Sequence, residues 1–414
     1  MKLPAPRFPP GLRPPAVLVA VLAVACASSR AVPSAGPPAP GYGYAEASPP
    51  LAPLESSALD GLGRILGARG APAPVLDARV SRAASALNVY RAGNPATAAC
   101  DVPTSIQETT LEWAGVYERP LCQRCLWTTR AQPNIPVEVL QGLADCMAGA
   151  EPSLFGLSAQ RIGSRTFVSL LGTQRRVLLN PMPRAAPMGQ PIVVGGSARL
   201  GTPLSVLVDV GSGPTQAFPV QPAADGTFQV TVPPVEKPAL VVLSVVQDGQ
   251  EVVRARLEAG IPARSFPLSA DEEGPLDANE QLRALQKALV EIRTERGLEA
   301  LPTVPQMDAV AQAMANQSQQ SAHWLQDPPP PDELSAANPS AAAHWGLKLQ
   351  GTSAKDLAAQ LRASPLMLWR LTRPGALQLG VGLAVPRAAR NERRVAAVVL
   401  LAAPVADAFT LPAP

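Results

Sequence analysis

The chain carries two histidines, His323 and His344, each followed by tryptophan. Imidazole transfers protons near neutral pH and binds divalent metals, so histidines close to acids are the first residues to test for catalysis. Asp332 and Glu333 follow His323 within ten residues and could complete a hydrolytic or metal-binding set. The simpler alternative makes both histidines ordinary half-buried or surface residues. One imidazole does not make a metal site, so we expect no metal and no cofactor, and His323, Asp332 and Glu333 stay weak catalytic candidates.

Four of the five cysteines lie within one stretch of the chain, at Cys100, Cys122, Cys125 and Cys146. An even number in an exported chain indicates two disulfides, for which three pairings are possible. The spacing of Cys122 and Cys125 leaves two alternatives, a four-cysteine zinc site and a redox pair. A zinc ribbon normally has two C-x-x-C pairs, and a redox pair needs a helix start in a thioredoxin-like unit, which "RPLCQRCLW" does not offer. The sequence favours disulfides and leaves their pairing open.

The N-terminus predicts export and lipid attachment. Three basic residues precede an apolar run, "AVLVAVLAVA", that is too short to span a bilayer and ends in small residues before Cys26. This resembles a bacterial lipoprotein signal, in which residues 1–25 are removed and Cys26 is lipidated; an ordinary secretory signal with a chance cysteine is the alternative. We expect a lipoprotein of the cell envelope. Ala27 resembles the residue after the cysteine in lipoproteins sent to an outer membrane, where the chain would face the periplasm.

The charge balance bears on the partners. The formal net charge of the whole chain is +3, and removing residues 1–25 takes away three basic side chains and no acid, which leaves zero. A neutral chain without a Lys/Arg cluster cannot hold phosphates by counterion release. We therefore expect no nucleic-acid partner.

Proline-rich stretches, in which apolar residues show neither helical nor strand periodicity, divide the chain into regions. Residues 26–56 predict an extended tether after the signal, and residues 263–279 predict a linker. Three folded regions remain: a cysteine-containing α/β region at 57–179, a β-sandwich at 190–262 and a mixed region at 280–405. The overall class expected is α+β.

The middle region has β-branched runs such as "PLSVLVDV" and "ALVVLSVVQ". Asp248-Gly249 separates two of the runs and can take the positive φ angles of a two-residue hairpin turn. We predict a small immunoglobulin-like β-sandwich here, a module that more often spaces or binds than catalyses.

The last region combines helices with two buried strands. "NEQLRALQKALVEIRTERG" has a leucine face and stops at Gly297, and a second helix should begin at Pro305. Ser353 and Asp356 have the spacing of a capping box for a third helix, with Asp in place of Glu. "LQLGVGLAV" and "RVAAVVLLAAP" follow as strands. This order predicts helices packed on a sheet.

Four pieces of this region, in order, resemble the CAP superfamily of cysteine-rich secretory, antigen 5 and pathogenesis-related 1 proteins. They are "IRTERGLEAL", "MDAVAQAMA", "WGLKLQGTSA" where the family writes G-E-N-I-A, and "SPLMLWRL" with "LGVGLAV" where it writes S-P-G-H-R-x-N-L and then G-V-G. The resemblance covers about 125 residues and implies a C-terminal α-β-α sandwich.

The resemblance also implies a degenerate cleft. The family's Glu falls on Leu347, its later His falls on Met367, and only His323 could match its earlier His. Each replacement removes a metal ligand or an acid, so the pocket should be more apolar than its relatives'.

The first region resembles the last one. "ILGARGAPAPVLDARVSRAASAL" (65–87) parallels 292–314, and 154–174 has the strand, turn and strand pattern of 379–403. The alternatives are a degenerate CAP-like repeat and chance similarity between Ala/Arg/Leu-rich helices.

Together these features predict a membrane-anchored, extracytoplasmic CAP-superfamily protein that binds a lipid, a peptide or an envelope partner rather than catalysing a reaction. The alternative is a metal- or His-dependent hydrolase or peptidase of the cell envelope. The sequence does not name the ligand.

Overall fold

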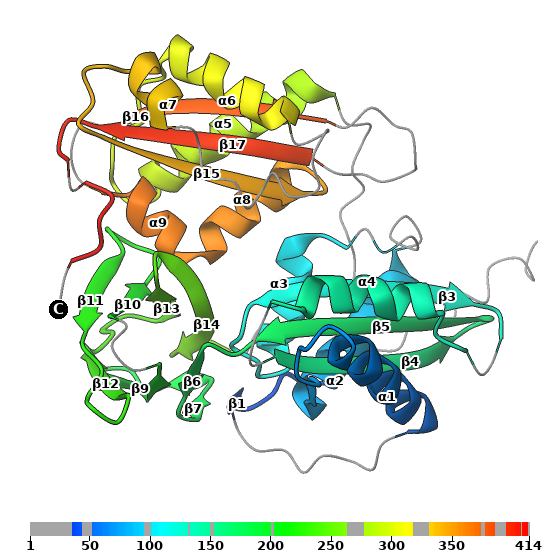
Figure 1. The fold of residues 1–414 in the computed structure, drawn as a ribbon. Coiled ribbons are helices and arrows are strands. Elements are labelled where there is room, and N and C mark those ends of the chain that lie inside the picture. Colours follow the sequence, from blue (N-terminus) through cyan, green and yellow to red (C-terminus); the bar gives the residue numbers. More distant parts are fainter. Residues whose placement is uncertain are drawn as a thin grey trace, which may run out of the picture.

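The computed structural model describes residues 35–43, 52–94, 100, 102–130, 133–149, 153–199, 203–262, 277–317, 331–373, 377–385, 395–406 and 408–412. The predicted signal 1–25, the predicted lipid-attachment residue Cys26 and the candidate His323 lie outside these residues. The chain forms three units that follow one another in sequence (Figure 1). They mix helices with several sheets, which is compatible with the α+β class.

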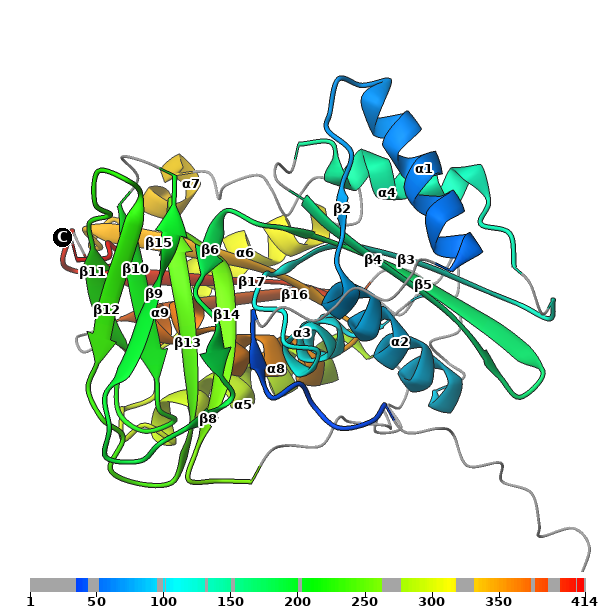
Figure 2. The same ribbon diagram turned by 90° about the horizontal axis from the view of Figure 1, so that it is seen from below.

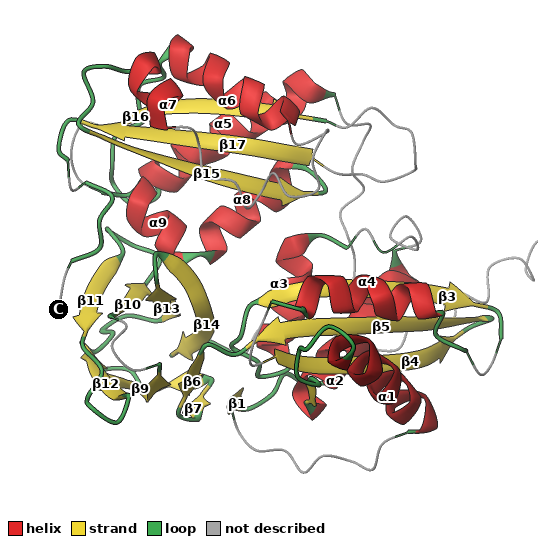
Figure 3. Ribbon diagram, viewed as in Figure 1, coloured by secondary structure: helices red, strands yellow, loops and turns green. Residues whose placement is uncertain are grey.

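The N-terminal unit is a four-stranded sheet with helices on both faces (Figure 3). Its helices are α1 (Pro53–Gly67), α2 (Ala78–Gly93), α3 (Thr104–Trp113) and α4 (Val137–Met147), and its strands are β2 (Val75–Leu76), β3 (Pro120–Thr128), β4 (Ser153–Ile162) and β5 (Arg165–Gln174). The strand order is β2-β4-β5-β3. One apolar core lies under α2 and α3, and a second lies under α1 and α4.

The middle unit has two facing sheets that share one core. One sheet orders β11 (Gln216–Val220), β10 (Leu204–Asp209), β13 (Ala239–Gln247), β14 (Gln250–Ala259) and β8 (Ala185–Ala186); the other orders β12 (Thr227–Val232), β9 (Ile192–Ala198) and β6 (Val177–Leu179). Figure 2 shows these strands, in green, side by side. Asp248 and Gly249 have φ of 52° and 72° in the turn between β13 and β14, as their sequence predicts.

Two predicted boundaries differ from the elements observed. The proline-bearing stretch before residue 190 supplies β7 (Met182–Pro183) and β8 to the middle unit, and β6, at the end of the region predicted as 57–179, belongs to the middle unit too. The predicted tether includes β1 (Gly41–Tyr42), which pairs with β7, and the first turn of α1. Short strands at sheet edges tolerate proline, which explains why the sequence pattern concealed them.

The C-terminal unit is a three-stranded antiparallel sheet between helices. Its elements are α5 (Ala278–Thr294), α6 (Pro305–Gln317), α7 (Pro331–Ala337), β15 (Ala343–Gly351), α8 (Ala354–Ala363), α9 (Pro365–Leu371), β16 (Gln378–Ala384) and β17 (Val395–Ala403). One core joins the sheet to α5, α8 and α9, and the other joins it to α6 and α7. Gly297 has φ of 73° just after α5, and Ser353 caps α8 by accepting a hydrogen bond from the Asp356 amide at 3.2 Å.

The N-terminal and C-terminal units arrange their elements in the same order, except that α9 has no counterpart in the N-terminal unit. The last strand of each is central, with β5 between β4 and β3, and β17 between β16 and β15. A short parallel segment precedes the second helix of each unit: Leu76 pairs with Phe155, and Thr303 pairs with Leu379. The topology of the two sheets is therefore equivalent.

Glycine lets the second helix approach the sheet closely in both units. A Cβ at Gly156 would lie 2.3 Å from the Val80 carbonyl carbon, and one at Gly380 would lie 2.5 Å from the Met307 Cβ. Val80 and Met307 are equivalent positions when residues 65–87 are set against 292–314. The helix and sheet thus meet at corresponding points.

Hydrogen bonds between the second helix and the sheet also fall at equivalent positions in the two units. The Leu157 amide donates to the Ser81 hydroxyl at 3.3 Å, and the Val381 amide donates to the Asp308 carboxylate at 2.7 Å. Each acceptor follows the helix residue that meets the glycine. The similarity between the two units therefore extends to individual residues.

Candidate functional site

Leu347 and Met367, the two positions predicted for a degenerate cleft, contribute to the same apolar core. Leu347 lies on β15 and is 8% exposed, and Met367 lies on α9 as a half-buried neighbour of that core. Side chains alternate across a strand, which places Leu347 on the sheet face that α5 and α8 cover. Apolar contacts occupy the place where the resemblance implies acid and imidazole groups.

Ser364 is the polar residue of the same segment. It ends α8 and caps α9, accepting a hydrogen bond from the Met367 amide at 3.3 Å. Its hydroxyl donates to the Glu251 carboxylate of β14 at 3.0 Å. The Ser-Pro step therefore fixes α9 against the middle unit.

The outer face of α9 is buried as well. Leu366 and Trp369 pack with Leu207 and Val246, which belong to β10 and β13. With its inner face on the C-terminal core, α9 lies between two units (Figure 1).

His344 lies on the opposite face of β15 from Leu347. Its Cα partner on β17 is Ala402, part of the core under α6 and α7, and its buried Nε2 atom has no hydrogen-bond partner among the described residues. The other candidates, Asp332 and Glu333, belong to α7, which packs against β15. The structure thus brings the α7 backbone over the His344 face, while the Asp332 and Glu333 side chains are not described.

The four cysteines form two disulfides, Cys100–Cys125 and Cys122–Cys146, as predicted in number. Their Cα atoms lie 5.5 and 6.1 Å apart. Because Cys122 and Cys125 are three residues apart on β3, their side chains point to opposite faces of the sheet and cannot pair with each other. The redox and zinc alternatives therefore do not match this arrangement.

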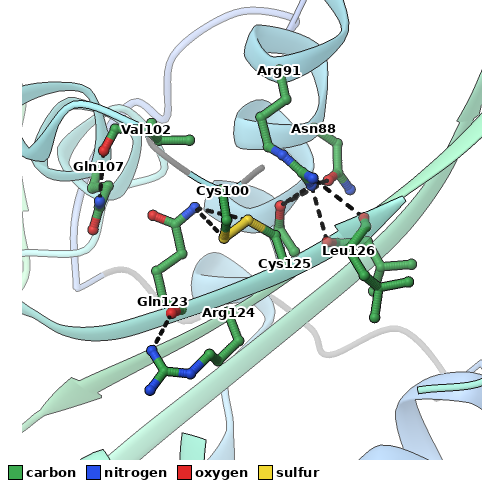
Figure 4. Close-up of a disulfide and its surroundings, with 11 residues drawn as sticks. Asn88, Arg91, Cys100, Val102, Gln107, Gln123, Arg124, Cys125 and Leu126 are labelled. Atoms are coloured by element: carbon green, nitrogen blue, oxygen red, sulfur yellow. Dashed lines mark hydrogen bonds between the residues drawn. A yellow bond between two sulfur atoms is a disulfide. The ribbon is translucent and has the colours of Figure 1, made fainter. Parts of the chain in front are cut away.

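Figure 4 shows the Cys100–Cys125 disulfide beside Gln123. The Gln123 amide nitrogen lies 3.8 and 3.7 Å from the two sulfur atoms, and its Oε1 is buried without a partner. Both disulfides border a cavity of about 320 Å³ between the N-terminal and C-terminal units. Its wall contains Cys100, Cys122 and Cys146 but not Cys125. The other lining residues are Val102, Thr104, Gln107, Pro120, Leu121, Gln123, Arg124, Gln350, Gly351 and Thr352.

A buried ionic network joins the N-terminal and middle units. Arg254 of β14 donates to Glu108 of α3 at 2.7 Å and to Glu251 at 2.5 Å, and Arg119 contacts both acids. Arg254, Glu108 and Glu251 are 2%, 3% and 7% exposed. Burial raises the pKa of Glu251 to about 7, although Arg119 opposes the shift. A buried network of this kind fixes geometry more than it adds stability.

Asp356 makes a second polar joint between units. Its carboxylate accepts hydrogen bonds from the amides of Thr352 at 3.0 Å, Thr104 at 3.3 Å and Ser105 at 3.1 Å. Thr104 and Ser105 begin α3, whose own N-cap, Pro103, offers no side-chain cap. Asp356 therefore satisfies the first amides of a helix in another unit.

An apolar cavity of about 400 Å³ lies where α9 and the C-terminal segment meet the middle unit. Its lining includes the Arg370 guanidinium-bearing side chain, which stacks on Trp345 at 4.4 Å from the ring centroid. Sequence reasoning did not single out Arg370 or Glu251, and it singled out Asp356 only for the spacing of a capping box at the start of its own helix. The contacts that give these three residues their roles involve residues far away in the chain, which no local pattern marks.

Within the described ranges, no group of three or more His, Cys, Asp or Glu side chains is placed to hold a metal ion. Among the same residues, no helix is both long and apolar enough to cross a membrane.

No protein-family model and no curated protein matches the chain. Among solved structures, one similarity is to a cysteine-rich secretory protein from Staphylococcus aureus, with 11% identity, a TM-score of 0.24 and coverage of 63% of this chain and 89% of that one. Another is to a carbohydrate acetylesterase from Xanthomonas citri, with 25% identity and a TM-score of 0.15. It spans 17% of this chain and 15% of the esterase chain. The first is a distant similarity to a CAP protein.

Proposed function

We propose that this protein is an exported, lipid-anchored member of the CAP superfamily that binds a hydrophobic ligand or an envelope protein and does not catalyse a reaction. Cys26 would carry the anchor, and the folded units would lie in the periplasm or on the outer membrane. The observation that carries the proposal is the packing of Leu347 and Met367 into one apolar core. Neither side chain can transfer a proton or bind a hard metal ion.

The order of helices and strands in the C-terminal unit supports the CAP assignment, together with the four sequence pieces that resemble the family. The repeated topology and register support a second, degenerate CAP-like copy in the N-terminal unit. The middle unit, with two sheets over one core, would be an immunoglobulin-like spacer. Its contacts with α9 fix the angle at which the last unit is held.

Two disulfides fit an extracytoplasmic protein, because thiols stay reduced in most cytosols. Anchoring is tested by expressing the full chain and Cys26→Ser in a bacterium and fractionating the cells with detergent. We expect the wild type in the detergent phase and Cys26→Ser in the aqueous phase. Equal partitioning of the two chains would exclude the lipid anchor.

The absence of catalysis is tested on the full chain by its metal content and by hydrolysis of ester and peptide substrates, with His323→Ala and His344→Ala beside it. We expect neither stoichiometric metal nor hydrolysis that depends on either histidine. Tight metal binding lost with His323→Ala would overturn the non-catalytic assignment.

One observation favours the hydrolase alternative. His344 has a buried ring nitrogen without a partner, and α7, which bears Asp332 and Glu333, covers the same side of the sheet. General acid–base catalysis needs an imidazole and a carboxylate within reach of one substrate atom. Under this alternative, His344→Ala and Glu333→Gln would each abolish hydrolysis without lowering the melting temperature.

A further inference from the structure

The cavity beside Arg370 has an apolar wall built from the middle unit and the C-terminal segment. Its apolar lining comes from β10 and the residue before it, from β13 and from the residues after β17, namely Pro203, Leu204, Val246, Phe409, Leu411 and Pro412. Phe409 also packs near Trp345, with ring centroids 6.5 Å apart. A volume of about 400 Å³ falls within the range of roughly 300–1,000 Å³ found for small-molecule sites.

Arg370 is the cation in this wall. Among the residues that the structure describes, its buried Nε atom has no hydrogen-bond partner, and its guanidinium stacks on Trp345. Across the described ranges, no carboxylate forms an ion pair with it. Burial lowers the pKa of Arg370 to about 10, so it stays charged at neutral pH. A partly desolvated cation without an anion is costly, and a bound anion would relieve that cost.

We propose that this cavity binds a monocarboxylate with an apolar body, of the class of medium-chain fatty acid anions. The guanidinium matches a carboxylate, which can accept two of its N–H groups in parallel. The apolar wall from Leu204 to Phe409 would cover the acyl chain. The inference gives a ligand class to the proposed binding function and rests on it, but it uses a site separate from Leu347 and Met367.

Charge and polarity narrow the ligand further. Exposed Asp248 also borders the cavity, and its repulsion acts on every anion there but grows with the charge of the ligand, so it disfavours doubly charged phosphates and dicarboxylates more than a monocarboxylate. A peptide would bury amide groups that need partners, whereas an acyl chain brings none. An uncharged alcohol of the same length would leave Arg370 without an anion.

The test uses the full-length chain with Cys26→Ser, so that no detergent competes for an apolar site. Binding of decanoate is measured by calorimetry beside decanol, acetate and decyl phosphate. We expect one decanoate per chain and at least tenfold weaker binding of the other three. Binding of decanol as tight as decanoate would contradict a role for the charge, and no decanoate binding at millimolar concentration would overturn the proposal.

Arg370→Gln should weaken decanoate binding at least tenfold, and Arg370→Lys should weaken it less, because the charge remains. Arg283→Gln, which removes an exposed positive charge on α5, is the matched control and should bind normally. Should Arg370→Gln not fold, Thr410→Trp tests the same site, since Thr410 is an exposed lining residue and a ring there would fill the cavity. Unchanged binding in the variant that folds would refute the proposal. A failure of decanoate binding would not change the results for Cys26-dependent anchoring or for hydrolysis. The ligand proposal and the proposed function can therefore fail separately.

Discussion

Replacing Asp356 with alanine should destabilise two units at once. The carboxylate accepts hydrogen bonds from three backbone amides, two of which belong to the first turn of α3. Loss of a helix cap typically costs about 0.5–2 kcal/mol, and a buried donor left without a partner costs about 1–3 kcal/mol. Since the amides of Thr104, Ser105 and Thr352 would all lose this acceptor, we expect Asp356→Ala to lower the free energy of unfolding by about 3–5 kcal/mol.

The matched control is Asp277→Ala. Asp277 also caps a helix, accepting a hydrogen bond from the Glu280 amide at 2.9 Å, but it is exposed and, among the described residues, its side chain accepts no hydrogen bond from another unit. Its replacement should cost about 1 kcal/mol, as an ordinary cap does. Asp356→Asn keeps one carbonyl oxygen as an acceptor and should fall between the two variants.

Urea denaturation followed by circular dichroism measures the loss of stability, and hydrogen exchange locates it. In Asp356→Ala the amides of Thr104 and Ser105 should exchange faster than in Asp277→Ala, although residue 356 is in another unit. A loss no larger than that of Asp277→Ala, or unchanged exchange at the start of α3, would refute the argument that Asp356 caps this helix.

Burial raises the pKa of Glu251 to about 7, so the folded chain binds this proton more tightly than the unfolded chain does. The resulting stabilisation is complete below the ordinary pKa of 4.5 and is lost as the pH rises through 7. The melting temperature should therefore rise as the pH is lowered from 8 to 5, and Glu251→Gln should make it depend less on pH. A Cβ at Gly382 would lie 2.2 Å from the Ala311 carbonyl carbon, so Gly382→Ala should cost about 1–3 kcal/mol in urea denaturation, and an unchanged midpoint would contradict the close packing of α6. Cys125→Ser or Cys146→Ser opens a disulfide of 25- or 24-residue separation and should cost roughly 3 kcal/mol each, with peptide mapping of the remaining bond as the check on the pairing.

Features encoded over a few neighbouring residues were accessible from the sequence. The Ser353 cap, the glycine at 297 and the Asp248-Gly249 turn each depend on residues within four positions, and the structure has all three. The number of disulfides followed from the cysteine count. Their pairing needed β3 to be recognised as a strand, since only then do Cys122 and Cys125 face apart.

The remaining features depend on contacts between distant segments. Arg370 lines a cavity because Trp345 and the C-terminal segment lie beside it. Asp356 caps a helix about 250 residues earlier in the chain. No periodicity or spacing carries that information. The predicted cleft positions, Leu347 and Met367, were placed by a family resemblance, and the burial of α9 between two units could not be read from its seven residues.

The joint between Asp356 and α3 bears on how the chain is made. The N-terminal unit emerges long before residue 356, whether the chain leaves a ribosome or crosses a membrane, so the first turn of α3 keeps open amides until the rest of the chain arrives. Arg254, which donates to Glu108 of the same helix, and Glu251, which accepts from Arg254, also come later. The N-terminal unit, which is made first, is therefore completed by contacts from the C-terminal unit, which is made last. A truncated chain would keep the first turn of α3 frayed. Such a fragment offers proteases an entry that the complete protein has closed, which gives quality control a way to distinguish the two.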